Sequence, residues 1–156
     1  MHPFTVGALL ALQTFHVLFL ALHDWIPLGR LNDVKGVRAA NSGSKLLAAT
    51  LISLAPFAVG LAASASYFGR AYPNWLYWWL WISYGFLLCG ELEAWWIPYL
   101  FFSPPERAAR YQVMFAATHA FLPERNGIRL NTLHVILHAA TVSLLIVLGA
   151  LSAQKS

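Results

Sequence analysis

Long apolar stretches constrain this chain more than any other feature of its sequence. Four stretches are long enough to cross a hydrocarbon core, which takes about 20 helical residues: residues 4–22, 46–67, 75–97 (or as far as 102) and 132–151. The stretches are continuous and do not alternate in short segments, which favours helices over a β-barrel. We therefore expect an all-α polytopic membrane protein, with one domain (1–156) built as a four-helix transmembrane bundle.

The composition agrees with a membrane setting. Hydrophobic residues make up 59% of the chain and charged residues only 10%, against roughly 25% charged in an ordinary soluble domain. Such a chain is too apolar for a disordered protein and too poor in polar side chains to cover a soluble surface. The net charge of +4 does not indicate nucleic-acid binding, because the basic residues are spread over several loops. We expect membrane lipids as partners and no nucleic acid.

The positions of the basic residues predict the orientation of the chain. Eight of them lie in two long loops that four spans would place on one side: Arg30, Lys35, Arg38, Lys45, Arg107, Arg110, Arg125 and Arg129. The opposite side has only Arg70 and Lys155. Because cytoplasmic loops carry an excess of Lys and Arg, we expect both termini outside and both long loops in the cytoplasm. The membrane expected is a plasma (inner) membrane.

Two further segments indicate contacts outside the bundle core. Residues 104–122 begin with Pro104, a residue favoured at the first helical position, and then place apolar residues at helical spacing. We expect an additional amphipathic helix there, lying on the membrane surface between the third and fourth spans. The second span is rich in small residues such as Gly60 and Ala63, which allow close helix packing. It is the expected contact surface for a homo-oligomer or a membrane complex.

Three ionisable residues lie deep inside the predicted spans, where such groups are costly and often functional. His16, Glu91 and His138 are each six residues from the predicted cytoplasmic end of their span, or about 9 Å deep. The topology therefore brings them to one level. Glu93 is two residues from Glu91, so the two side chains point in very different directions, and only one faces the bundle centre.

Four more residues of the same chemical types lie near the cytoplasmic boundary. His23 and Asp24 follow the first span, His119 lies in the expected surface helix, and His134 is in the first turn of the fourth span. His134 and His138 are four residues apart, a spacing that places two imidazoles on one helix face.

Together these residues predict a metal site. Mixed imidazole and carboxylate ligands suit zinc, iron or manganese. The expected ligands of this divalent ion are His16, His23, Glu91, His119, His134 and His138. Glu93 or Asp24 would then serve as general acid or base.

The function expected from this pattern is a membrane metalloenzyme. It would hydrolyse or oxidise a lipid or another hydrophobic small molecule near the cytoplasmic face. One alternative is a metal-free acid/base isomerase or cyclase that uses the same residues. A second is a b-type haem protein for electron transfer, with His16 and His138 as axial ligands. A third is a non-enzymatic subunit of a membrane complex.

Overall fold

The computed structural model describes residues 3–154 and shows an all-helical chain. Lys155, one of the residues used to predict the orientation, lies outside the described residues. The elements in chain order are α1 (Pro3–Leu22), η1 (Gly29–Leu31), α2 (Val34–Ala40), α3 (Gly43–Ser66), α4 (Asn74–Glu91), η2 (Leu92–Trp96), α5 (Ile97–Leu100), α6 (Pro105–Phe115) and α7 (Thr132–Ala153).

Within residues 3–154, three helices are long and apolar enough to cross a membrane: α1, α3 and α7. They correspond to the first, second and fourth predicted spans, so the expectation of a membrane protein is confirmed at this level. The third predicted span begins as α4, which is rich in Trp and Tyr. These rings favour the membrane–water interface over the hydrocarbon core. The third predicted span, and with it the count of four, therefore stays a prediction, as does the side on which the termini lie.

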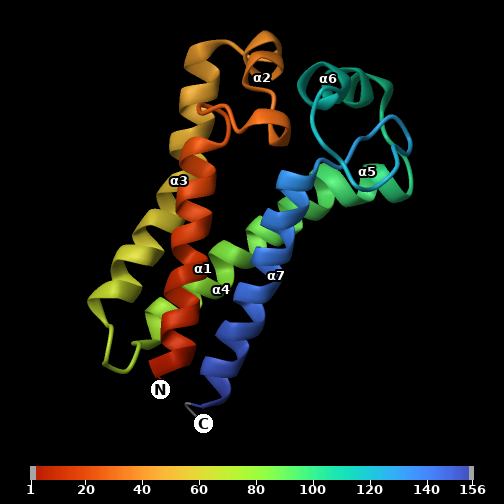
Figure 1. The fold of residues 1–156 in the computed structure, drawn as a ribbon. Coiled ribbons are helices and arrows are strands. Elements are labelled where there is room, and N and C mark those ends of the chain that lie inside the picture. Colours follow the sequence, from red (N-terminus) through yellow and green to blue (C-terminus); the bar gives the residue numbers. More distant parts are fainter. Residues whose placement is uncertain (1–2, 155–156) are drawn as a thin grey trace.

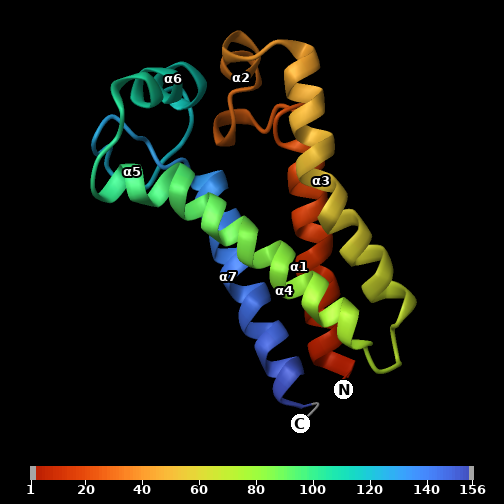
Figure 2. The ribbon, with the colours of Figure 1, turned by 180° about the vertical axis from the view of Figure 1, so that it is seen from behind.

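The long helices form one bundle, and the connecting segments gather at its two ends (Figure 1). α1 packs against α3 and α7, while α4 crosses the bundle and contacts both α3 and α7 (Figure 2). The two long loops, with α2 and α6 packed on each other, lie at one end. We call this the loop end. Both termini lie at the opposite end, the terminal end of the bundle.

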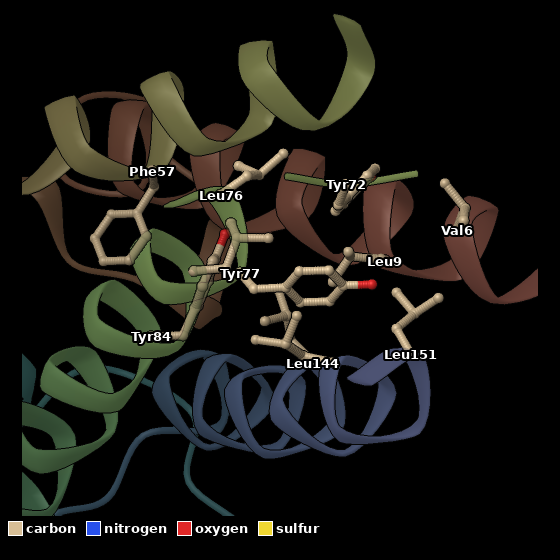
Figure 3. Packing of buried hydrophobic residues seen from close by; sticks show 11 residues of the cluster. Val6, Leu9, Phe57, Tyr72, Leu76, Tyr77, Tyr84, Leu144 and Leu151 are labelled. Atoms are coloured by element: carbon tan, nitrogen blue, oxygen red, sulfur yellow. The ribbon is translucent and has the colours of Figure 1, made fainter. Parts of the chain in front are cut away.

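The terminal half of the bundle is filled by a single apolar cluster (Figure 3). Leu9 of α1, Leu76 and Leu80 of α4 and Leu148 of α7 are fully buried in it. Gly60 allows α3 to approach α4, because a Cβ there would lie 3.1 Å from Leu80 Cδ2. The expectation that small residues of the second span permit close helix packing is confirmed at this position.

A π-helical turn, η2, interrupts the helix that begins as α4. Pro98 leaves carbonyl groups of this turn free to bond with α6. Pro98 has no N–H, so it cannot donate a helical hydrogen bond to the carbonyl of Ala94 or Glu93. Both carbonyls are satisfied from α6 instead: Tyr111 Oη donates to Ala94 O at 2.8 Å, and Arg107 Nη1 donates to Glu93 O at 2.8 Å. These two hydrogen bonds from α6 therefore stabilise the π-helical turn.

The helix expected at 104–122 is shorter in the structure and ends at Phe115. Thr118 closes its end, since its N–H and its hydroxyl both donate to Phe115 O, at 3.0 and 2.6 Å. The following residue, His119, leaves the helix because its N–H donates to Arg30 O at 2.6 Å. Met114 and Phe115 are buried against the rest of the loop end. A location of α6 on the membrane surface stays a prediction.

We predict that Tyr111→Phe lowers the stability of the fold by about 1–3 kcal/mol, because it leaves the Ala94 carbonyl without its donor. Thermal unfolding in detergent micelles, followed by Trp fluorescence, measures the loss. Tyr67→Phe is the matched control, since Tyr67 has no hydroxyl hydrogen bond among those found in residues 3–154, and it should change Tm little. Equal effects of the two substitutions would contradict this account of the turn.

Candidate functional site

A threonine hydroxyl joins two of the three deeply placed site residues, His16 and Glu91. Thr141 Oγ1 of α7 lies 3.0 Å from His16 Nε2 of α1 and 2.7 Å from Glu91 Oε1 of α4. His16 and Thr141 are fully buried, and Glu91 is 5% exposed. We call His16, Thr141 and Glu91 the central triad. It brings together three helices at the level where the polar residues were expected to meet.

The hydrogen bonds of the central triad restrict where its protons can lie. His16 Nδ1 is 2.7 Å from Leu12 O, and a carbonyl oxygen only accepts, so Nδ1 carries a hydrogen. The Thr141 hydroxyl has one hydrogen to give. If it donates to His16 Nε2, Glu91 must be a protonated acid that donates to Thr141. If it donates to Glu91, His16 must be an imidazolium that donates to Thr141.

These two arrangements contain the same number of protons. In the first, the proton lies on Glu91 and both groups are neutral. In the second, it lies on His16 and the two groups form an ion pair. Thr141 Oγ1 also lies 3.1 Å from Leu137 O of its own helix. When its hydrogen points there, both neighbours must donate to Oγ1, and the triad holds one proton more. The geometry therefore allows a proton to be stored on His16 or on Glu91 and passed through Thr141.

More buried polar groups surround the triad. Gln13, one turn before His16 on α1, is fully buried, and its amide has no hydrogen-bond partner among the described residues. The same holds for the Tyr84 hydroxyl and for Glu91 Oε2. The Tyr84 ring lies 5.1 Å from the His16 ring, centroid to centroid. Buried polar atoms are usually hydrogen-bonded, so the triad is surrounded by an unusual number of unsatisfied polar groups.

His138 belongs to the neighbouring turn of α7 but has a different partner. Trp96 Nε1 of η2 donates to His138 Nδ1 at 2.9 Å. An imidazole that accepts at Nδ1 carries its hydrogen at Nε2 when it is neutral. His138 is 5% exposed, and its Nε2 has no partner among the described residues. Of the two acids Glu91 and Glu93, Glu91 is the one that faces inward. His138 lies one turn before Thr141, whose hydroxyl is hydrogen-bonded to Glu91.

His134 and His23 form a ring cluster nearer the loop end. The His134 ring lies 4.3 Å from the Trp95 ring and 5.6 Å from the His23 ring, centroid to centroid. Asn131 caps α7: its Oδ1 accepts from the His134 N–H at 2.9 Å and lies 2.7 Å from His134 Nδ1. The cap thereby orients the His134 ring.

Asp24 lies beside this ring cluster and contacts only one of its imidazoles. Asp24 Oδ1 is 3.2 Å from His23 Nε2. Burial raises the pKa of the Asp24 carboxyl, and the neighbouring His23 opposes that rise. Because His23 Nδ1 lies 2.8 Å from Phe19 O, both ring nitrogens of His23 have partners.

Two predicted site residues lie apart from the triad. Glu93 is exposed and pairs with Arg107, with Oε1 2.6 Å from Nη2. His119 is exposed in the loop after α6, where its Nδ1 lies 2.7 Å from Thr132 Oγ1. Both anchor connections at the loop end, so the structure separates them from the buried acid and the buried imidazoles.

The expected metal ligands do not converge in this structure. Within residues 3–154, no group of three or more His, Cys, Asp or Glu side chains is placed to hold a metal ion. The ring nitrogens explain this in part, since both nitrogens of His16 are engaged, by Leu12 O and Thr141 Oγ1. For the same reason, His16 has no free ring nitrogen in this structure to serve as an axial haem ligand.

Thr141, Tyr84 and Trp96 were absent from the residues expected at the site. Thr141 follows His134 and His138 at helical spacing, so a polar stripe along an otherwise apolar helix was the available signal. Tyr84 stands seven residues before Glu91, two turns along the same face. Trp96 had no such signal, because the π-helical turn changes which residues of this segment face α7.

No family model, curated protein or solved structure matches the chain.

We predict that Thr141→Val destabilises the bundle by about 1–3 kcal/mol, because it leaves His16 Nε2 and Glu91 Oε1 buried without their common partner. Thr14→Val is the matched control. Thr14 is exposed on α1, and its hydroxyl donates only to Leu10 O of its own helix. Its loss should change thermal stability in micelles little. Thr141→Ser, which keeps the hydroxyl, should restore most of the stability, and failure to do so would argue against the hydrogen-bonded bridge.

Proposed function

We propose that this protein is a membrane enzyme that moves a proton on a hydrophobic substrate, as an acid/base isomerase or cyclase does. The observation that carries this proposal is the central triad, a buried carboxyl and a buried imidazole that share one hydroxyl. Carboxyl and imidazole groups are the usual general acids and bases of enzymes. In this triad, the two can exchange a proton without the participation of bulk water.

The working group of the triad is Glu91. Its Oε2 has no partner among the described residues, whereas its Oε1 faces Thr141. When Oε2 takes a proton from a substrate carbon, the proton on Oε1 can pass to Thr141 and the Thr141 hydrogen to His16 Nε2. The reverse sequence returns a proton to another atom of the substrate. Protons and electrons balance over the cycle, so the reaction class needs no oxidant or reductant.

The apolar cluster of the terminal half supports an enzyme over a proton path across the membrane. Leu9, Leu76, Leu80 and Leu148 are fully buried between the triad and the terminal end. The half-buried His23 and His134 and the buried His138 lie on the other side, toward the loop end. Polar groups therefore lead from the loop end to the triad and give way to leucine packing beyond it.

A substrate test uses deuterium. Purified protein is incubated with a membrane lipid extract in ²H₂O, and mass spectrometry measures deuterium gained at carbon. We expect one hydrophobic compound to gain deuterium with the wild type, and Glu91→Gln to slow the gain by at least about a hundredfold, the usual contribution of a general acid/base. Glu93→Gln is the matched control, because Glu93 is exposed on the protein surface, and it should retain the wild-type rate. Wild-type exchange in Glu91→Gln would refute the proposal.

Metal removal separates this proposal from the metalloenzyme expected from the sequence. We predict that dialysis against a chelator leaves the deuterium gain unchanged, because the chemistry of the central triad needs no Lewis acid. Elemental analysis of the same sample measures bound zinc, iron and manganese. Loss of exchange on chelation, with recovery after one of these ions is added, would instead establish the metal-dependent reaction.

A further inference from the structure

A pocket lined by aromatic rings lies at the terminal end of the bundle, between the beginning of α4 and the end of α7. It has a volume of about 540 Å³ and is lined by Asn74, Tyr77, Trp78, Trp81 and Ser152. The four lining residues of α4 recur at helical spacing and so share one face of that helix. We call this space the aromatic pocket. None of its lining residues belongs to the central triad.

The two indole rings of the aromatic pocket are accessible from outside. Trp81 Nε1 donates to Ser152 Oγ at 3.4 Å, and a Cβ at Gly149 would lie 4.0 Å from the edge of the Trp81 ring. These contacts position the ring against α7, yet Trp81 is 37% exposed. Trp78 is 67% exposed and contacts no other ring among the described residues. The faces of both rings are therefore available to a ligand.

The aromatic pocket lies at the level of lipid headgroups when α7 crosses a membrane. α7 has 22 residues, so it is about 33 Å long, close to the thickness of a hydrocarbon core, roughly 30 Å. Ser152 is next to its last residue, Ala153. The pocket is therefore at one boundary of the core, where tryptophan is enriched. A lipid headgroup at this boundary meets the rings directly.

The electrostatics of the aromatic pocket favour a cation that needs no hydrogen bond. The face of an indole ring is electron-rich and attracts a cation within about 6 Å of the ring centroid. The described residues that line the pocket include no Asp or Glu, and the Ser152 hydroxyl already donates to Leu148 O at 2.9 Å. A primary ammonium has N–H groups that require acceptors, whereas a trimethylammonium has none. The lining therefore suits a quaternary ammonium group better than a primary one.

The two helix ends beside the pocket carry partial charges of opposite sign. Ser152 is in the last turn of α7, where the carbonyl dipoles are negative, and Asn74 is in the first turn of α4, where the N–H dipoles are positive. Both helix ends lie at the terminal end of the bundle (Figure 2). Anionic phosphate is favoured at the beginning of a helix and a cation at its end. A phosphocholine group carries this pair of charges.

We propose that the aromatic pocket binds the headgroup of a choline phospholipid. Its trimethylammonium group lies against the faces of Trp78 and Trp81, and its phosphate lies toward the first turn of α4. The acyl chains follow the apolar outer surface of the bundle into the membrane. This binding site is separate from the central triad, so it does not depend on the proposed acid/base reaction.

The binding test compares dimyristoyl phosphatidylcholine with dimyristoyl phosphatidylethanolamine in dodecyl maltoside micelles. The two probes share their chains and phosphate, and they differ only in N-methyl against N–H groups. Native mass spectrometry measures the bound lipid, and nuclear Overhauser transfer from the N-methyl protons to indole protons locates it. We expect the choline lipid to bind the wild type about tenfold more tightly. Equal binding of the two lipids would overturn the proposal.

Substitutions of tryptophan test the assigned pocket. Trp78→Leu removes one ring face and keeps an apolar side chain, so it should weaken binding of the choline lipid about fivefold to tenfold. Trp75→Leu is the matched control, because Trp75 is 51% exposed on the same helix but lies outside the lining, with its ring 6.4 Å from that of Tyr67. It should leave the affinity unchanged. Equal losses in the two variants would place the lipid on the general aromatic belt and overturn the pocket.

Two further measurements test the charge and the source of the ligand. Ser152→Lys introduces a positive charge at the pocket and should abolish the preference for the choline lipid; an unchanged preference would contradict the proposed position of the trimethylammonium group. Choline chloride has the same cation without phosphate or chains, so it should displace the lipid only at concentrations at least about a hundredfold higher, if at all. Displacement at equal concentration would make soluble choline the ligand and overturn the assignment to a lipid.

Discussion

The structure depends on one constraint: an acid and an imidazole buried inside an apolar bundle must satisfy each other. Water does not reach such groups as it does on a soluble surface, so an unpaired ionisable group there is costly. Thr141 resolves this by offering one oxygen to both His16 and Glu91. A single hydroxyl hydrogen cannot saturate two acceptors, so the pair must share a proton. The same arrangement that makes burial tolerable also provides the means for proton transfer.

The loop end holds this arrangement in position from outside the bundle. Pro98 leaves two carbonyls of the π-helical turn without helical donors, and Arg107 and Tyr111 of α6 supply the missing hydrogen bonds. The turn then directs Trp95 toward His134 and Trp96 toward His138. π-helical turns are frequent at functional sites. In this chain, the turn follows Glu91 directly and so couples the loop helix to the polar centre.

The two halves of the bundle have different roles. Leucine and tyrosine packing fills the terminal half and stabilises the fold (Figure 3). The half toward the loop end carries the polar side chains and the aromatic partners of the histidines. This division supports the function proposed from the central triad.

The sequence by itself determined the helical class, the membrane setting and the depth of the polar residues. These follow from apolar length, low charge and helical rise, which are local properties, and they placed His16 and Glu91 at one level. Only the tertiary structure decided which groups meet. Whether Glu91 or Glu93 faces inward depends on helix rotation, the partner of His138 depends on the register of a π-helical turn, and the separation of His119 from the buried site depends on where Thr118 ends α6. The expected set of metal ligands was too broad for this reason: equal depth in a membrane is set by residue counts, whereas ligation requires side chains from different helices to point at one atom.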